Sequence, residues 1–526
     1  AHDDAVDVEF PCDVEDRLRG ITLDAAGFDL DTGVFESLDS DAGAIGEFLA
    51  VVEVLGLYHR PLVGSLERFD HVQHDGRDLG VFAREVDDRL RGPTRPVRFS
   101  INWQQGYVFA HGGASKRTVM IVPETGQRGR KTGIVNRLPS VPRVMSQRQP
   151  VIVQAVRTPQ GKHGGVFAET GSEELSVPLV EEMMAATGLE SGDIDDVRWG
   201  CAKQVDEQSN NIGRVIAMLA LGEEVPGTTI DRLCASSAEA IMTASDAIRA
   251  GTRDAIVAGG VENMSRNERR QDIGVYDGIA EQYDVAGLQM GQTAEKVARE
   301  YDISREAQDA YGARSQQRAV EATEEGRFEE ETVPVTGHDD EGEEILVEED
   351  EGLRPGTTAE SVAKLPPAFE EDGSVTAANA SQISDGAAAV LVTSREFAAE
   401  HGLEIMAEIE GHNVAGVDPT VMGVGPVPAV RGIWAENGRE ADDYDLVELN
   451  EAFASQTIYC RDELGFDDER FNVNGGAIAI GHPLGASGAR LPVTLIHELQ
   501  RRGGGLGLST MCVGYGQGAA IEFRVP

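Results

Sequence analysis

Short apolar strands alternate with helical segments from Pro150 onward, and this alternation constrains the fold more than any other feature of the chain. The order opens with the strand PVIVQAV and continues with helical patterns at 175–187, 211–221 and 236–249, each separated by a further strand. Strands and helices that alternate at this spacing form a sheet covered by helices. A similar order returns between 405 and 526, which indicates two related halves. The expected fold class is therefore α/β.

A region between the two halves interrupts the alternation. It contains an amphipathic pattern from Thr293 to Glu321, which predicts one long helix, and an acidic loop from Asp339 to Glu351. We interpret this region as an inserted loop domain. The predicted domains are residues 145–263 with 384–404 for the first half, 264–383 for the insert, and 405–526 for the second half.

The charge of the chain changes near Met145. Residues 1–144 hold 23 of the 91 acidic and 17 of the 46 basic side chains, so most of the acidic excess lies downstream. From Arg91 to Val144 there is a single acidic residue, Glu124, against ten Lys and Arg. Two interpretations of residues 1–144 stay open: a small accessory domain fused in front of the α/β region, or an extension that arises from a mis-set start with the true start at Met145.

Within this extension the local patterns predict three features. Residues 44–58, AIGEFLAVVEVLGLY, fit one amphipathic helix, and residues 96–110 fit a pair of strands around a turn. Residues 125–144 show neither helical nor strand periodicity and are typical of a linker.

The composition limits the environment and the partners. A formal net charge of -45 argues against nucleic acid or an anionic membrane as a partner, and it favours a protein kept in solution in strong salt. We expect a halophilic cytoplasm, because no signal peptide and no membrane-length apolar run is found. The five cysteines show no CxxC spacing, so neither a disulfide framework nor a metal site is expected.

Cys234 follows the β-branched segment GTTIDRL and precedes a helical segment with apolar residues at Ala238, Ile241, Met242 and Ile248. This pattern places Cys234 at a helix N-terminus, where backbone N–H groups and the helix dipole favour the nucleophilic thiolate. A buried structural cysteine is the alternative interpretation, and the position alone does not exclude it.

Three residues of the second half are suited to work with such a nucleophile. His482 lies in the glycine-rich segment NGGAIAIGHPLGASGAR, where a histidine can take a proton from a thiol. Cys512 ends an apolar strand and precedes a glycine-rich turn whose N–H groups could bind a developing oxyanion. Asn450, in VELNEAF, can hold a water or a carbonyl without adding charge. Two cysteines and a histidine in three turns indicate a two-step covalent mechanism.

Together these motifs closely resemble those of the thiolases, the acyl-CoA C-acyltransferase family. The resemblance covers residues 145–526 and rests on eight segments in family order. The segments are RTPQGKHGG, DRLCASSAEA, AGGVENMSR, MGQTAEKVAREYDISREAQDAYGARSQQRA, RPGTTAESVAKLPPAFEEDGSVTAANASQISDGAAA, NEAF, GHPLGASG and CVGYGQG. The fold implied by the resemblance has duplicated βαβαβαββ halves in a layered α-β-α-β-α arrangement, with the inserted loop domain between them.

The implied reaction is a reversible thioester Claisen condensation of acetyl-CoA with acyl-CoA, or the thiolysis of 3-ketoacyl-CoA, through an acyl-Cys234 intermediate. By the same resemblance, His482 would activate Cys234, and Cys512 would be the acid/base that removes the α-proton. One oxyanion site would use the N–H groups of Cys234 and Gly514. The other would use His482 and a water held by Asn450.

The resemblance also implies the binding partners. Coenzyme A thioesters are substrates, no further cofactor is expected, and a homodimer or homotetramer is implied. The insert would bind CoA, and the implied CoA-binding residues are Arg354, Ser361, Phe369, Ala377 and Ser381, with Met290, Ala452 and Phe453 near the acyl end.

Four positions depart from the family pattern: Ser237, Gln289, Tyr515 and Gln517. These departures leave the acyl-chain preference open. The sequence does not determine the direction of the reaction in the cell. Related enzymes with Cys-His-His or Glu-Cys-His sites are disfavoured by Asn450 and Cys512. A catalytically silent CoA-binding or scaffold subunit is the remaining alternative.

Overall fold

The computed structural model describes residues 148–266 and 277–526, together with the backbone of five strands further upstream. The chain divides into two units, Ala1–Leu138 and Pro139–Pro526. In the first unit, β1 (Ile21–Asp24) and β2 (Gly27–Leu30) form an antiparallel pair, and β3 (Arg98–Asn102), β4 (Tyr107–Gly112) and β5 (Ser115–Met120) form an antiparallel sheet.

The strand pair predicted between residues 96 and 110 is therefore confirmed as β3 and β4. The predicted helix at 44–58 and the predicted linker at 125–144 lie outside the described residues.

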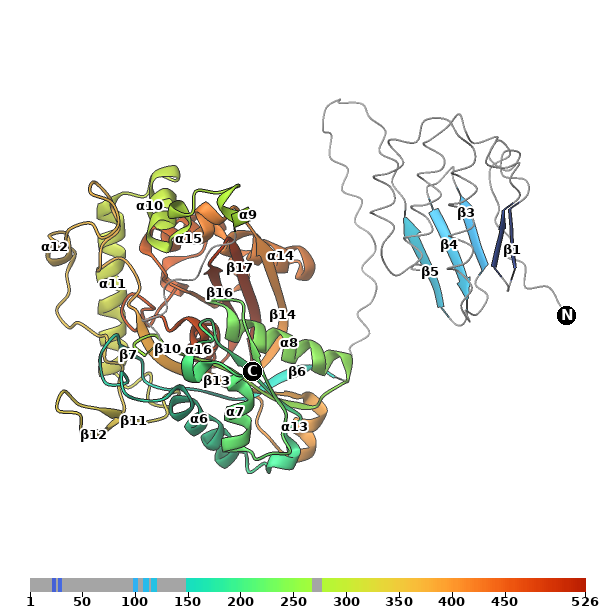
Figure 1. The fold of residues 1–526 in the computed structure, drawn as a ribbon, viewed down its shortest axis with the longest axis horizontal. Coiled ribbons are helices and arrows are strands. Elements are labelled where there is room, and N and C mark those ends of the chain that lie inside the picture. The colour runs from blue at the N-terminus through green and yellow to red at the C-terminus, as the bar shows by residue number, and fades with distance from the viewer. Residues whose placement is uncertain are drawn as a thin grey trace. The chain divides into compact units, whose positions relative to one another are not determined.

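The second unit contains two halves of similar element order (Figure 1). The elements of the first half are β6 (Pro150–Arg157), β7 (Gly161–Lys162), α6 (Ser172–Thr187), β8 (Asp196–Gly200), α7 (Ile212–Ala220), β9 (Gly227–Ile230), α8 (Ser236–Ala250), β10 (Ala255–Asn263), β13 (Ser384–Ser394) and α13 (Arg395–His401). Those of the second half are β14 (Ala407–Gly416), α14 (Pro426–Asn437), β15 (Leu446–Leu449), α15 (Ala454–Leu464), α16 (Leu484–Arg501), β16 (Gly505–Val513) and β17 (Gln517–Val525).

The strands of both halves join into one mixed sheet in the order β15-β16-β17-β14-β6-β13-β10-β8-β9, with β7 paired to β13. Neighbours β8 and β9, β8 and β10, and β15 and β16 run parallel, and the other pairs run antiparallel. The two halves meet in this sheet between β6 and β14, where only Ile152 with Ala407 and Val151 with Glu408 are paired.

The layers follow from strands that are apolar on both faces. Every residue of β10 and β13 is buried. On β10, Ile256 and Ala258 pack with α8 and α16, whereas Val257 and Val261 pack on the other face with α6 and α7. Successive side chains of a strand point to opposite faces, so such a strand needs a helical layer on each side.

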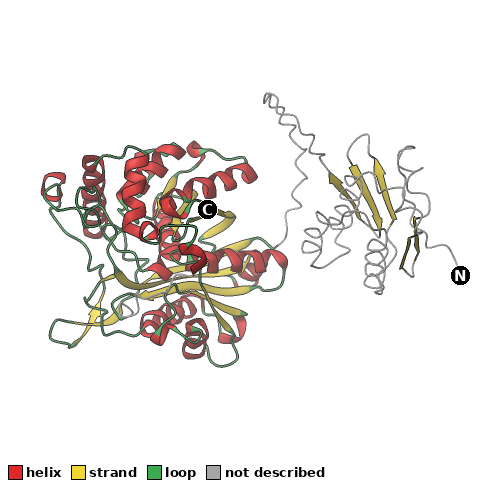
Figure 2. Cartoon of the chain, turned by 45° about the horizontal axis from the view of Figure 1, so that its top comes forward, coloured by secondary structure: helices red, strands yellow, loops and turns green. Residues whose placement is uncertain are grey.

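Helices α8 and α16 pack against each other between the halves, while α6 and α7 cover the outer face of the first half and α14 and α15 that of the second. Figure 2 shows helices on both sides of the strands. The expected α-β-α-β-α layering is thus confirmed.

The insert differs from its prediction in two places. Its elements are α9 (Asp277–Ala280), α10 (Met290–Glu300), α11 (Arg305–Glu324), β11 (Val335–His338), β12 (Glu344–Val347) and α12 (Ala359–Val362). The single helix predicted from Thr293 to Glu321 is wrong, because Asp302 has a positive φ of 56° and Ser304 caps a new helix by accepting from the Ala307 N–H. The predicted acidic loop contains β12, which pairs with β11 as a hairpin.

Candidate active site

Cys234 lies in the turn between β9 and α8, as the sequence predicts. The turn is closed by side chains of its own segment: Asp231 accepts a hydrogen bond from the Leu233 N–H, and the Ser236 hydroxyl accepts from the Arg232 N–H. Leu233 has a φ of 49°, in the left-handed region that residues other than glycine rarely adopt. Such strain persists only where the surroundings over-determine it, and here it sets the position of the next residue, Cys234.

The sulfur of Cys234 is half-buried and lies within hydrogen-bond range of two backbone N–H groups, its own and that of Gly514. The pKa of the Cys234 thiol is nevertheless raised to about 11, mainly by burial and also by Glu262 and Asp231, while the two N–H groups oppose the rise. The N–H groups favour the thiolate, as the helix N-terminus predicts, but burial outweighs them. At neutral pH Cys234 is a thiol that needs a base.

Cys512 is the second-to-last residue of β16 and is 2% exposed. Burial is the main cause that raises the pKa of its thiol, and the charge of Cys234 raises it further, so the two thiols influence each other electrostatically. Cys512 belongs to a small apolar cluster with Met422, Ala452 and Phe453. This thiol is thus held in its protonated form beside Cys234.

His482 lies in the turn before α16. Gly481 has a φ of 121°, and the hydroxyl of Ser384 fills the space where a Cβ of that residue would lie, so this position requires glycine. The backbone N–H of His482 donates to Ser384 Oγ at 3.0 Å and to the Gln382 carbonyl at 3.1 Å. These bonds fix the imidazole to the start of β13 in the other half.

The tautomer of His482 follows from its partners. The Ser487 hydroxyl donates to the Pro483 carbonyl at 2.8 Å, so it accepts from His482 Nδ1–H at 2.6 Å. Nε2 then carries the lone pair, and it lies 3.3 Å from Nδ2 of Asn450. Burial, helped by Arg490, lowers the pKa of His482 to about 3, so the imidazole is neutral at pH 7. A neutral imidazole can accept a proton from a thiol.

Asn450 directly follows β15 and is fully buried. Its backbone N–H donates to the Thr510 carbonyl on β16, and its carbonyl accepts from Gln456 Nε2. Its side-chain oxygen, Oδ1, has no hydrogen-bond partner among the described residues. A buried amide oxygen without a partner is costly, which fits a site where a water or a substrate group binds.

The predicted acyl-end residues adjoin this group. Met290, at the start of α10 and 38% exposed, lies within 4 Å of the place where a Cβ on Gly514 would be. Ala452 and Phe453 are buried in the apolar cluster of Cys512. The ring of Phe369, 44% exposed, packs edge-on against Phe453 with centroids 6.1 Å apart.

The other predicted CoA residues lie further from the two cysteines. Ser381 is tied to the site, because its N–H donates to the Ala452 carbonyl. Ala377 is exposed. Arg354 and Ser361 are exposed on the segment around α12, which packs on α11, and no contact joins them to Cys234 within the described residues. The structure thus brings the residues around Cys234 together with those predicted at the acyl end. Arg354 and Ser361 lie at the periphery.

Two of the departures from the family pattern have structural partners. Ser237 Oγ accepts from the Ala489 N–H at 2.9 Å, which joins α8 to α16. Gln517 Oε1 accepts from Arg232 at 2.9 Å, and Arg232 also pairs with Glu239. The Arg232–Gln517 bond connects the Cys234 turn to the strand that follows Gly514.

Sequence reasoning did not identify several residues that hold this site. Ser487 fixes the His482 tautomer, Ser384 anchors its backbone, and Glu262 accepts from the Gly485 N–H. Ser487 could have been identified from the sequence, because it lies five residues after His482, in the first turn of the helix that follows. Ser384 and Glu262 come from the other half and carry no local signal.

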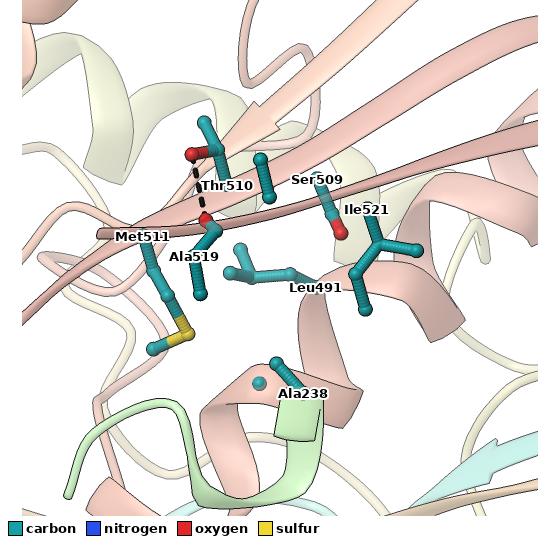
Figure 3. A pocket seen from close by; sticks show the side chains of 9 residues that line it. Ala238, Leu491, Ser509, Thr510, Met511, Ala519 and Ile521 are labelled. Atoms are coloured by element: carbon teal, nitrogen blue, oxygen red, sulfur yellow. Dashed lines mark hydrogen bonds between the residues drawn. The ribbon is translucent and has the colours of Figure 1, made fainter. Parts of the chain in front are cut away.

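A small cavity of about 10 Å³ lies behind the catalytic group, between α8, α16, β16 and β17 (Figure 3). Its lining residues are Ala238, Gly488, Leu491, Ser509, Thr510, Met511, Ala519, Ala520 and Ile521. Thr510 Oγ1 donates to the Ala519 carbonyl beside it. The space is about that of one water molecule, so this cavity is a packing gap and not a substrate site.

The described residues also bear on metals, disulfides and membranes. Cys201, Cys234, Cys460 and Cys512 are free thiols. Within residues 148–266 and 277–526, no cluster of three or more His, Cys, Asp and Glu side chains has the geometry to hold a metal ion. Of the helices that the structure describes, none has the length and apolar character needed to cross a membrane.

Comparison with known proteins adds independent information. Among curated proteins, the 3-ketoacyl-CoA thiolase of Aliivibrio fischeri is 45% identical over 383 residues, which is 72% of this chain and 99% of that protein. The 3-ketoacyl-CoA thiolase of Cronobacter sakazakii is 46% identical over 381 residues, 71% of this chain and 98% of that protein.

Solved structures agree with these relatives. The Bacillus anthracis acetyl-CoA acetyltransferase is 40% identical with a TM-score of 0.67, and human mitochondrial 3-ketoacyl-CoA thiolase is 36% identical with a TM-score of 0.66. Each match covers 72% of this chain and 99% of the solved chain. The family models for the thiolase N-terminal and C-terminal domains match residues 150–396 and 403–525. The chain belongs to the thiolase family.

Proposed function

We propose that the chain is an acyl-CoA C-acyltransferase that interconverts 3-ketoacyl-CoA plus CoA with acetyl-CoA plus acyl-CoA through an acyl-Cys234 intermediate. One observation carries the proposal. Cys234 lies beside Cys512 with the Gly514 N–H at its sulfur, and a neutral His482 is bonded to Asn450 in the same region. A nucleophile, a base and two sets of oxyanion partners are thereby assembled from both halves.

In the thiolysis direction, His482 Nε2 accepts the proton of the Cys234 thiol as the sulfur attacks the C3 carbonyl. The N–H groups of Cys234 and Gly514 hold the oxyanion that forms. The C2–C3 bond then breaks, and its electron pair leaves with acetyl-CoA as an enolate. The protonated His482 and a water on Asn450 stabilise the enolate oxygen, and the Cys512 thiol protonates C2.

The second step returns every group to its starting state. The thiol of CoA attacks the acyl-Cys234 carbonyl and gives its proton to the Cys512 thiolate. The carbon–sulfur bond to Cys234 breaks, and the released thiolate takes the proton back from His482. Thioester exchange onto a thiol is nearly isoenergetic, so both directions are accessible. The protons balance with no further cofactor, and CoA thioesters act only as substrates.

We propose that CoA approaches along the insert. Arg354 is an exposed cation suited to a phosphate, and Ser361 and Ala377 are exposed on the same region. Phe369 and Ser381 lead from there to the acyl end at Met290, Ala452 and Phe453. These contacts support this direction of binding, because Phe369 and Ser381 each touch a residue of the Cys512 cluster.

We also propose that the chain forms a homodimer or homotetramer. β9 is the last strand of the described sheet, so one side of it has no strand neighbour there. Met218 and Leu219, on the adjacent α7, are 51% and 59% exposed. An open strand edge beside apolar side chains favours pairing with another copy. The acidic composition supports a salt-rich cytoplasm as its setting.

The test is thiolysis of acetoacetyl-CoA and of longer 3-ketoacyl-CoA by the full chain, followed by peptide mapping of the protein after incubation with acetyl-CoA. We expect CoA-dependent loss of substrate and one acyl group on Cys234. Cys234→Ser is the matched control and should carry no thioester. Absence of both turnover and the adduct for every chain length would leave a catalytically silent CoA-binding subunit as the better description.

A further inference from the structure

Glu262 and Cys512 occupy matching places in the two halves. Both are the second-to-last residue of a nine-residue strand, β10 and β16. Glu262 pairs with Gly386 on β13, and Cys512 pairs with Gly518 on β17. The first half therefore carries a carboxylate where the second half carries the catalytic thiol.

Glu262 is fully buried and accepts hydrogen bonds from three separate segments. Its Oε2 accepts from the Ala202 N–H at 2.9 Å and from the Gly485 N–H at 2.9 Å. Its Oε1 accepts from the Lys203 N–H at 3.1 Å and from Gln208 Nε2 at 2.7 Å. Burial raises the pKa of Glu262, and these four donors oppose the rise because they favour the ionised carboxylate.

The bond to Gly485 reaches across the two halves. Gly485 lies in the first turn of α16, three residues after His482. A Cβ at this position would lie 2.5 Å from the Val261 carbonyl and 2.9 Å from the Cys201 Cα, so glycine is needed for the helix to approach β10. Glu262 thereby fixes the distance between the His482 turn and the first half.

The carboxylate also acts on the nucleophile through its charge. Glu262 and Asp231 both raise the pKa of Cys234. The buried Cys512 thiol is another titratable neighbour of Cys234. Around Glu262 itself the nearest titratable side chain is the buried thiol of Cys201, 4.0 Å away. A negative charge at this place disfavours a lone thiolate at Cys234.

We propose that Glu262 is a positioning residue for this reaction, holding the His482 turn in register with the first half through Gly485 and placing a negative charge that acts on Cys234. The inference rests on the proposed function for its kinetic part. Glu262 does not touch the reacting atoms, because its four hydrogen bonds come from three backbone N–H groups and from the side chain of Gln208.

Two substitutions separate position from charge. Glu262→Gln keeps the length but replaces one acceptor oxygen by an amide nitrogen, so two of the four donors lose their acceptor. Glu262→Asp keeps the charge but shortens the reach to Gly485. For both variants we expect kcat for thiolysis to fall on the order of 100-fold, with KM changed by less than about twofold, because misplacement affects the chemical step rather than CoA binding.

The rate of iodoacetamide alkylation at Cys234, mapped by peptide mass and measured against pH, reads the charge effect without turnover. Its midpoint should move to lower pH in Glu262→Gln and stay near that of the parent in Glu262→Asp. The control is Glu522→Gln, a fully buried carboxylate on β17 that accepts from Tyr444 and Asn437 and has no link to the site. It should lose stability but keep kcat and the midpoint.

The proposal is overturned if folded Glu262→Gln keeps the parent midpoint, or if both Glu262 variants keep the parent kcat. Should Glu262→Gln fail to fold, Glu262→Asp still decides the kinetic part. If the parent chain shows no thiolysis at all, the proposed function fails, while the alkylation profile still decides whether Glu262 acts on Cys234.

Discussion

The turn before α8 and the turn before α16 are the same structural device in the two halves, yet they hold their reactive groups differently. Cys234 follows Leu233, whose φ of 49° strains a residue with a side chain, whereas His482 follows Gly481, which adopts its φ of 121° freely. Cys234 is half-buried, and His482 is 6% exposed with four hydrogen-bond partners in its surroundings.

The difference separates two tasks. The Cys234 turn presents a sulfur to substrate and to the N–H of Gly514 from the other half. The His482 turn instead holds an imidazole in one tautomer, through Ser487 and Asn450. By the proposed mechanism, one junction of the duplicated scaffold serves attack and the other serves proton transfer, and each depends on the opposite half.

The largest effect should come from the Cys234 turn. Cys234→Ala removes the nucleophile, so we expect kcat to fall by at least about 10⁴-fold and the acyl adduct to disappear, as measured by thiolysis rate and intact mass. Cys460→Ala, a buried thiol bonded to the Gly423 carbonyl, is the control and should keep both. Acylation at another residue in Cys234→Ala would mean that the two turns have been assigned the wrong tasks.

Cys512→Ala should separate acylation from carbon–carbon chemistry. The variant should still take an acetyl group from acetyl-CoA onto Cys234, because His482 and the N–H groups remain. Condensation should fall by about 10³-fold, since no thiol is left to move the α-proton. Exchange of the α-hydrogen of acetyl-CoA with deuterated solvent measures this step directly. Normal exchange in Cys512→Ala would contradict the acid/base role.

The His482 turn has a signature in stability. The folded pKa of His482 is lowered to about 3 from the ordinary value near 6.5, so the unfolded chain binds the proton more tightly. The stability from neutral His482 is fully present above pH 6.5 and is lost as the pH falls toward 3. At pH 4.5 the loss from this group is about 3 kcal/mol.

His482→Asn should therefore lose less stability between pH 7 and pH 4.5 than the parent does, as measured by urea unfolding at both values. An equal loss of unfolding free energy in the two proteins would show that protonation of the buried imidazole does not dominate the destabilisation of the protein by acid.

The smallest effect concerns the bond between Arg232 and Gln517, which joins the Cys234 turn to the strand after Gly514. Gln517→Ala should weaken transition-state stabilisation by about 1 kcal/mol, which corresponds to a fall in kcat/KM of about fivefold. The effect is small because Arg232 keeps its ion pair with Glu239. Steady-state kinetics with acetoacetyl-CoA provide the measurement, and Arg431→Ala, at an exposed pair with Glu463, should change nothing. A larger loss for Gln517→Ala would show that the Cys234 turn depends on this brace.

Much of this arrangement could be predicted from local patterns. Helix α8 begins at Ser236, its predicted start, because the apolar spacing after Cys234 is strong. The helix break at Asp302 was missed because a single residue with positive φ leaves the amphipathic pattern intact on both sides.

The protonation of the site could not be predicted in the same way. A helix N-terminus favours a thiolate, but the pKa of Cys234 is set mainly by burial, which depends on residues from both halves. Likewise Glu262 reads as one acidic residue at a strand end, and only the fold brings it to the Gly485 N–H. Local sequence determines the turns, whereas tertiary contacts determine their electrostatics.

The Gly514 N–H that faces Cys234 has a consequence for synthesis. It lies 280 positions further along the chain, and His482 lies 248 positions further. At the usual rate of about 5–20 residues per second, a ribosome needs roughly 15 to 60 s to add these partners. During that interval the nascent first half carries Cys234 without His482 or the Gly514 N–H, so by the proposed mechanism acyl transfer to Cys234 begins only after the second half has been added.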